Sequence, residues 1–123
     1  MIDILVIDDE KQLRDLLIRI LKREGYKAEA AGNGTEGLKI FAETPARLVV
    51  VDMNMPGMDG ATTIGELRQT RQDFSVLAMS GTPWRTPDVA KALGADASIT
   101  KPFLPKAFLD VVSSMLEAGG RPA

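Results

Sequence analysis

The sequence contains no histidine and no cysteine. Without these residues the chain has no imidazole base or metal ligand, no phosphohistidine, no disulfide and no thiolate zinc site. Near Met1 it also lacks a charged segment followed by a long apolar run, and no apolar run approaches the roughly 18 residues of a membrane span. The chemistry must therefore come from carboxylates, hydroxyls and lysines, and we expect a cytoplasmic location.

A strong excess of either charge is also missing, because 15 basic and 17 acidic residues leave a formal net charge of −2. Such a chain has no large positive field, so we expect no binding to nucleic acid. A length of 123 residues, of which 45% are hydrophobic and 26% charged, is ordinary for one globular domain with a packed core. We place this domain at residues 1–118, followed by a flexible C-terminal tail at residues 119–123.

Short apolar runs alternate with segments of helical spacing along the chain. The strongest runs, Ile4–Ile7 and Leu48–Val51, are typical of strands buried on both faces of a parallel sheet. Further strands are expected at residues 27–31, 75–79 and 97–100. Helices are expected from Leu13 to Leu21 with a stop at Gly25, around Leu38 and Phe41, from a cap at Asp59 to Leu67, from Pro87 to Gly94, and from Pro105 onward.

This alternation predicts an α/β fold, with a five-stranded parallel sheet covered on both faces in a doubly wound (βα)5 topology. In the flavodoxin-like strand order 2-1-3-4-5, a crevice opens where the first and third strands part at their carboxyl ends. Polar residues stand at the carboxyl ends of four predicted strands: Asp8, Asp9, Asp52, Ser80 and Lys101. We therefore expect residues from distant parts of the sequence to converge on one rim of the sheet.

The acidic members of this group predict a magnesium site. Carboxylates brought together repel one another, and at least one would be pushed towards its protonated form without a cation. Mg²⁺ suits them, because it prefers carboxylate, water and phosphate oxygens and uses only one or two protein carboxylates. Beside such an ion, an aspartate can attack phosphorus without a general base, because it is already ionised. Lys101 and Ser80 would then stabilise charge on the phosphoryl oxygens.

The same motifs resemble the receiver domains of bacterial two-component response regulators, and the resemblance covers almost the whole chain. Asp8-Asp9, Asp52 with Met55-Pro56-Gly57-Met58-Asp59-Gly60, Ser80-Gly81 and Lys101-Pro102-Phe103 carry it. The resemblance implies a phosphorylation-dependent signalling switch, stand-alone or part of a longer regulator. Such a domain is not an enzyme in the usual sense, since it catalyses only its own phosphorylation and dephosphorylation.

The resemblance also implies roles for single residues. Asp52 would accept a phosphoryl group from a histidine kinase or a histidine phosphotransferase, and a downstream protein partner or output domain would respond to the altered surface. Asp8, Asp9 and Asp52 would bind Mg²⁺, together with the backbone carbonyl of Asn54. Ser80 and Lys101 would bind the phosphoryl oxygens, and the Lys101-Pro102 peptide would be cis.

One position departs from the family pattern. Many receivers carry a tyrosine or phenylalanine three residues before the lysine, and this aromatic side chain rotates inward on phosphorylation. The present chain has Ser98 there. We therefore predict that the output depends on motion of the loop after Ser80, which contains Trp84, rather than on aromatic rotation.

Two other functions need the same fold or the same residue types. An aspartate-nucleophile phosphoester hydrolase also uses magnesium, a lysine and a hydroxyl, but such enzymes carry a second acid two residues after the nucleophile, where this chain has Asn54. A flavin-binding module would need a phosphate-binding loop after the first strand, where Asp8 and Asp9 would repel phosphate.

Three further patterns receive structural interpretations. Gly32–Gly37 fits the dinucleotide fingerprint, but it follows the weakest strand, so we expect a turn with Asn33 or Thr35 as helix cap. We interpret the methionines at 53, 55, 58 and 79 as packing residues rather than a soft-metal site. The basic residues of the first helix are expected on its solvent-exposed face: Arg14, Arg19, Lys22 and Arg23. A further hypothesis is that they bind an acidic patch on a kinase.

Overall fold

The computed structural model describes residues 1–55, 57–81 and 94–118. Its sheet has five strands: β1 (Ile2–Ile7), β2 (Ala28–Ala31), β3 (Ala46–Asp52), β4 (Ser75–Ser80) and β5 (Ala97–Thr100). The helices of the described residues are α1 (Lys11–Arg23), α2 (Gly34–Glu43), α3 (Gly60–Thr70) and α5 (Pro105–Glu117). The helix expected from Pro87 lies outside the described residues apart from Gly94, as do Trp84 and the tail at 119–123.

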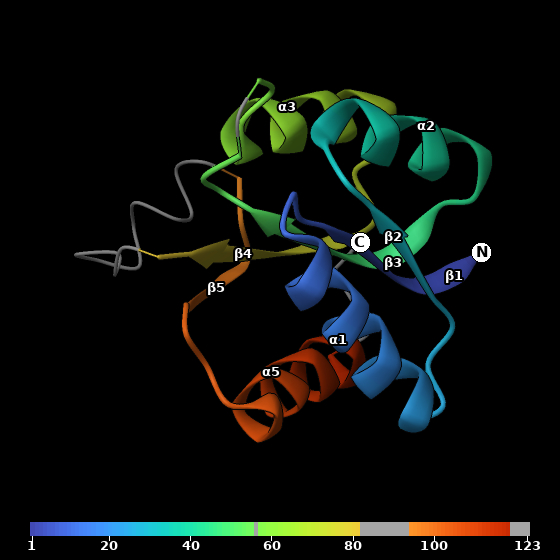
Figure 1. The fold of residues 1–123 in the computed structure, drawn as a ribbon. Coiled ribbons are helices and arrows are strands. Elements are labelled where there is room, and N and C mark those ends of the chain that lie inside the picture. Colours follow the sequence, from blue (N-terminus) through green and yellow to red (C-terminus); the bar gives the residue numbers. More distant parts are fainter. Residues whose placement is uncertain (56, 82–93, 119–123) are drawn as a thin grey trace.

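The strands are all parallel and lie in the order β2-β1-β3-β4-β5, which confirms the predicted flavodoxin-like topology. Helices α2 and α3 cover one face of the sheet, and α1 and α5 cover the other (Figure 1). This division follows from right-handed crossovers, because the chain moves one way along the sheet from β1 to β2 and the other way from β2 onward. None of the described helices is long and apolar enough to cross a membrane.

Two hydrophobic clusters lie on opposite faces of the sheet because side chains alternate along each strand. Leu5 and Val49 belong to the cluster beneath α2 and α3, together with Phe41 and Leu67. Ile4 and Val50 belong to the cluster facing α1 and α5, whose helical members are Leu17, Leu21, Phe108, Val112 and Leu116. Both faces of β1 and β3 are therefore buried, which explains why these strands are continuous apolar runs.

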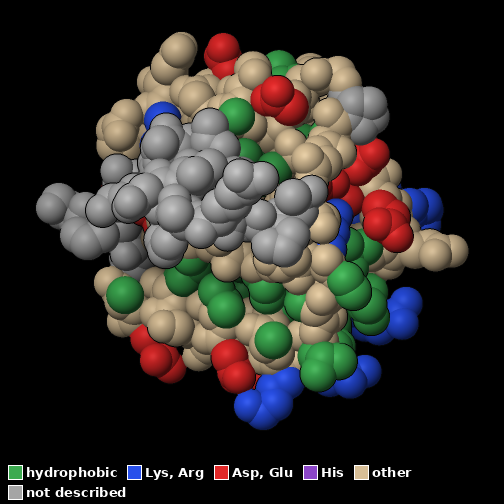
Figure 2. Space-filling view, turned by 90° about the vertical axis from the view of Figure 1, so that its left-hand side faces the viewer, with side chains coloured by type: hydrophobic (Ala, Val, Ile, Leu, Met, Phe, Trp, Pro, Cys, Tyr) green, Lys and Arg blue, Asp and Glu red, His purple; other side chains and the backbone are tan. Residues whose placement is uncertain are grey.

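The layer of α1 and α5 also leaves apolar side chains at the surface. Figure 2 shows hydrophobic side chains gathered over the lower half of the molecule, on the side where β5 forms the edge of the sheet. Two large hydrophobic residues of this layer are exposed, Leu16 on α1 at 41% and Leu104 before α5 at 74%. Leu16 shares the helical spacing of the buried leucines but does not belong to the hydrophobic cluster beneath α1 and α5.

Capping residues and a glycine mark the helix boundaries, as expected from the sequence. The Asn33 side chain accepts a hydrogen bond from the Glu36 amide at 2.8 Å, so Asn33 rather than Thr35 caps α2. Asp59 caps α3 in the same way, accepting from the Thr62 amide at 2.8 Å. Gly25 has a φ of 92°, a left-handed conformation that glycine adopts without steric cost, and it ends the segment after α1.

Gly37 provides a test of the packing between α2 and β1. A Cβ atom added there would lie 2.8 Å from Cγ1 of the buried Ile7, closer than carbon atoms pack. We predict that Gly37→Ala lowers the free energy of unfolding by about 1–3 kcal/mol, measured by urea denaturation.

The matched control is Gly65→Ala in α3, where an added Cβ would meet nothing within 4 Å. Because alanine is a better helix former than glycine, this variant should be more stable than the wild type by up to about 1 kcal/mol. Equal stability of Gly37→Ala and the wild type would show that the α2–β1 contact has room for a methyl group.

Candidate functional site

The structure brings the polar strand-end residues together at one edge of the sheet. Asp8 follows β1, Asp52 is the last residue of β3, and Ser80 is the last residue of β4. Lys101 follows β5, and its Nζ atom lies 3.0 Å from Asp8 Oδ2 and 3.3 Å from Asp52 Oδ2. Residues 93 positions apart in the sequence therefore form an ion pair, as the parallel topology predicts.

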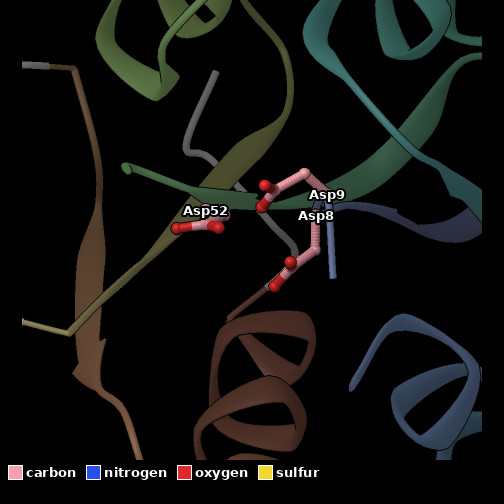
Figure 3. A group of neighbouring side chains, drawn as sticks. All are labelled: Asp8, Asp9 and Asp52. Atoms are coloured by element: carbon pink, nitrogen blue, oxygen red, sulfur yellow. The ribbon is translucent and has the colours of Figure 1, made fainter. Parts of the chain in front are cut away.

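Three carboxyl groups surround one space in this site (Figure 3). One oxygen atom from each of Asp8, Asp9 and Asp52 lies within 4.8 Å of the other two. Asp8 and Asp52 are buried, whereas Asp9 is exposed at the rim. These oxygens are close enough to share one small cation, and Asp9 leaves the space open to solvent.

Backbone and lysine contacts fix the Asp8 carboxylate from both sides. Its Oδ1 atom accepts a hydrogen bond from the Glu10 amide at 2.8 Å, while Oδ2 accepts one from Lys101 at 3.0 Å. The backbone amide of Asp8 continues the pairing of β1 with β2, donating to the Ala31 carbonyl at 3.1 Å. The position of this buried carboxylate is therefore set by three separate segments of the chain.

Burial and neighbouring charges shift the pKa values of these groups. Burial raises the pKa of Asp8 above its ordinary value, although the Glu10 amide and Lys101 oppose the rise. Partial desolvation, a hydrogen bond with Asp52 and the charge of Asp52 raise the pKa of Asp9. Burial alone would lower the pKa of Lys101, but its ion pairs with Asp8 and Asp52 outweigh this effect and raise it. One ammonium group thus faces three carboxyl groups, which favours an additional cation.

Asn54 and Ser80 border the Asp52 side chain. The Asn54 amide donates to Asp52 Oδ1 at 3.0 Å, and its side-chain Nδ2 donates to Ser80 Oγ at 3.4 Å. The Lys101 amide donates to the Ser80 carbonyl at 2.7 Å, which joins the end of β4 to the start of the segment after β5. The peptide between Lys101 and Pro102 is cis.

Gly60 allows α3 to begin directly against the Asp52 backbone. A Cβ atom at this position would lie 2.6 Å from Met53 Cα and 2.7 Å from the Asp52 carbonyl oxygen. Any side chain would push on the backbone of Asp52 itself. The glycine after Asp59 is therefore required by a close approach of two backbone segments beside the site.

Other residues singled out in the sequence lie apart from this group. Met55 and Met79 belong to hydrophobic clusters on opposite faces of the sheet, so they pack the core and do not share a metal site. Ser98 is exposed on β5, beside Ala78 of β4. The expectation that all basic residues of α1 face solvent is wrong for Arg14, which is half-buried and donates from Nη1 to the Asp8 carbonyl at 2.9 Å.

The Lys101–Asp8 pair gives a prediction on stability. Lys101→Ala removes the cation from a fully buried carboxylate, so at neutral pH with EDTA the free energy of unfolding should fall by about 1–3 kcal/mol. The loss should shrink on acidification, because Asp8 then becomes protonated and no longer needs the ammonium group. Urea denaturation at both pH values measures this difference.

Lys106→Ala is the matched control. Lys106 Nζ lies 3.1 Å from Asp110 Oδ2, a distance close to that of the Lys101–Asp8 pair, but its side chain is 85% exposed against 20% for Lys101. Solvent screens such a pair, so the change should stay below about 0.5 kcal/mol. Equal losses for the two lysines would contradict a special role of the buried pair.

The raised pKa of Asp9 predicts that this carboxylate destabilises the metal-free chain. In EDTA at neutral pH, Asp9→Asn should raise the thermal midpoint by about 1–4 °C. Below about pH 4 both proteins carry a neutral side chain and should be equally stable. As the pH rises, the unfolded wild type releases its proton before the folded wild type does, so the wild type loses stability relative to the variant. Calorimetric melting curves across this range measure the gap.

Asp15→Asn should show the opposite sign. A hydrogen bond with Lys11 lowers the pKa of Asp15, so its charged form is favoured in the folded chain. Removing that charge should slightly lower the thermal midpoint at neutral pH. A fall in the midpoint for Asp9→Asn as well would contradict the charge repulsion inferred at the site.

Comparison with known proteins agrees with this geometry. The family model described as the response regulator receiver domain matches residues 4–113. The chain is 30% identical to the sensory transduction protein RegX3 of Mycolicibacterium smegmatis, over 97% of this chain and 52% of RegX3. It is 37% identical to the response regulator MprA of Mycobacterium sp. (strain KMS), over 81% of this chain and 44% of MprA. It is also 36% identical to the sensor kinase CckA of Brucella abortus, over 93% of this chain and 12% of CckA.

Solved structures of similar length share the fold. The chemotaxis protein CheY4 of Vibrio cholerae superposes with a TM-score of 0.86 at 26% identity, covering 93% of this chain and 98% of CheY4. A CheY-like receiver domain protein of Methanospirillum hungatei gives a TM-score of 0.88 at 28% identity, covering 96% and 95% of the two chains. The chain spans about half the length of RegX3, and less of MprA and CckA. The family match, the strand order and these relatives show that the chain belongs to the receiver domain family of two-component response regulators.

Proposed function

We propose that residues 1–118 form a phosphorylation-dependent switch in which Asp52 is the phosphoryl acceptor. The observation that carries this proposal is the position of Asp52 at the end of a central strand, with Lys101 Nζ 3.3 Å from its Oδ2 atom. Asp8 and Asp9 lie on the other side of the same space. A nucleophilic carboxylate, a cation site and a fixed ammonium group are what phosphoryl transfer to an aspartate requires.

The acidic residues fit Mg²⁺. Their oxygens lie within 4.8 Å of one another. Burial, together with the neighbouring charge of Asp52, raises the pKa values of Asp8 and Asp9, and a divalent ion would stabilise their charged forms. Asp8, Asp9 and Asp52 would hold the ion, with the Asn54 carbonyl as a further ligand. When bound, Mg²⁺ supplies positive charge that offsets the negative charge of an incoming phosphoryl group.

The remaining residues orient the acceptor and receive the charge. The Asn54 amide donates a hydrogen bond of 3.0 Å to Asp52 Oδ1 and so helps to fix the orientation of this carboxylate, which lies beside those of Asp8 and Asp9 (Figure 3). An Asp52 oxygen forms the bond to phosphorus while the bond from phosphorus to the donor nitrogen breaks, and the departing imidazole takes up a proton. Lys101, whose pKa is raised, keeps its charge throughout, and the Ser80 hydroxyl donates to a phosphoryl oxygen.

The donor in this proposal is a histidine kinase or a histidine phosphotransferase, and the recipient of the signal is a downstream partner or an output domain in the cytoplasm. RegX3, MprA and CckA are longer than this chain, whereas CheY4 is covered to 98%, so the relatives fit both an output region in the same protein and a separate partner. Catalysis would be limited to the domain's own phosphorylation and dephosphorylation. The hydrolase alternative finds no support in the site, because the Asn54 side chain is an amide that donates to Ser80.

Phosphorylation adds about −1.5 to −2 charges to Asp52, next to carboxylates that already repel one another. Lys101 and the bound ion would compensate, so the phosphorylated state should draw Lys101 and Ser80 towards Asp52. Because Ser98 replaces the usual aromatic residue, we propose that the response continues into the segment after Ser80. Residues 82–93 of that segment lie outside the described residues.

Asp52→Asn tests the acceptor. The amide is a poor nucleophile, so the variant should lose labelling by a small acyl-phosphate donor in the presence of Mg²⁺, measured by the mass of the intact protein. EDTA should abolish labelling of the wild type. Asp59→Asn is the control, because Asp59 is outside the site and asparagine caps a helix as well as aspartate does. Wild-type labelling of Asp52→Asn would exclude Asp52 as the acceptor.

A further inference from the structure

Arg14 reaches from α1 to the peptide that joins two of the site carboxylates. Its Nη1 atom donates a hydrogen bond of 2.9 Å to the carbonyl oxygen of Asp8. That oxygen belongs to the planar peptide group between Asp8 and Asp9, so its orientation affects where both side chains leave the backbone. Arg19, on the same helix, is exposed, whereas Arg14 is half-buried.

Gly32 provides room for the Arg14 guanidinium group. A Cβ atom at Gly32 would lie 3.2 Å from Arg14 Nη1 and 3.7 Å from its Cζ. The Glu36 carboxylate is on the same side, since its Oε2 atom would be 3.6 Å from that Cβ and accepts from the Gly32 amide at 3.2 Å. The φ of Gly32 is outside the left-handed region, so a methyl group here would act by pushing the guanidinium group a few tenths of an ångström aside rather than by straining the backbone.

The two carboxylates on either side of this peptide differ in how they are held. The Asp8 carboxylate is anchored by the Glu10 amide and Lys101, but Asp9 is exposed and faces the charge of Asp52. Repulsion would be relieved if the peptide rotated and carried Asp9 into solvent. The hydrogen bond from a charged guanidinium opposes this rotation, because charge-assisted hydrogen bonds are stronger than neutral ones.

We propose that Arg14, seated against Gly32, is a positioning residue that holds the Asp8–Asp9 peptide so that both carboxylates face the cation site. This inference rests on the proposed function, since it assigns Arg14 to the same site. Arg14 acts through the backbone and contacts neither the ion nor the phosphoryl group. The turn between β2 and α2 thereby becomes part of the structure that fixes the cation ligands.

Two different substitutions disturb this contact. Arg14→Gln removes the guanidinium, and Gly32→Ala keeps Arg14 but places a methyl group where its Nη1 atom packs. Arg14→Gln should weaken Mg²⁺ binding, measured by titration calorimetry, by about 10-fold, the lower end of the effect of removing a residue that orients metal ligands. Gly32→Ala should weaken it less, because the guanidinium group is displaced and not removed. Arg19→Gln is the matched control with the same change of charge, and it should leave the dissociation constant unchanged.

A metal-free measurement separates positioning from general stability. In EDTA, the carbonyl carbon resonance of Asp8 in NMR spectra should shift in Arg14→Gln and in Gly32→Ala, and stay in place in Arg19→Gln, because the first variant loses the hydrogen bond and the second displaces its donor. Arg14→Lys keeps the charge without the planar fork, so it should restore Mg²⁺ affinity only in part. If Arg14→Gln does not fold, Gly32→Ala carries the test alone.

Wild-type Mg²⁺ affinity together with an unshifted Asp8 resonance in Gly32→Ala and Arg14→Gln would overturn the inference and leave Asp52 as the acceptor. Complete restoration by Arg14→Lys would also overturn it, since charge alone would then explain the effect. A wild-type protein that binds no Mg²⁺ would overturn the proposed function and this inference together.

Discussion

The repulsion among the carboxylates of Asp8, Asp9 and Asp52 is the constraint on which this site depends. Folding brings their oxygens within 4.8 Å of one another and supplies one ammonium group, that of Lys101, to offset them. The fold therefore holds charge that it does not fully neutralise. In the proposed function, a cation, and later a phosphoryl group that also requires positive charge, would find a site whose electrostatic field is already in place.

Strand register is what converts this charge into a defined geometry. Ile7 pairs with Val51 across β1 and β3, which places the residues that follow, Asp8 and Asp52, side by side. A slip by one residue would turn every side chain of the strand to the other face and separate the two carboxylates. Because β1 and β3 are buried on both faces, such a slip would also exchange the side chains that pack in the two hydrophobic clusters, so close packing of the core protects the geometry of the site.

The sequence predicted the features that depend on local pattern. Continuous apolar runs identified the central strands, and polar residues at the strand ends identified the site, because parallel strands place their carboxyl ends at one edge. Asn33 and Asp59 were recognisable as caps by residue type and position.

The role of Arg14 could not be predicted from the same patterns. On a helical projection it belongs with Arg19 and the other basic residues, and its long side chain can point in many directions. What directs it inward is space at Gly32, on a different strand end, together with a backbone carbonyl that no side-chain pattern reveals. Leu16 shows the converse, since this leucine has the spacing of core residues but is 41% exposed.

The separation of the two hydrophobic clusters by the sheet has a consequence for how the sequence of such a domain evolves. Mutations in side chains without shared neighbours have nearly independent energetic effects. The layer of α1 and α5 can therefore accumulate substitutions without requiring compensation beneath α2 and α3, and the reverse also holds. Each face can adapt to its own neighbours while the strand ends stay where they are, which is consistent with a TM-score of 0.88 to a relative at only 28% identity.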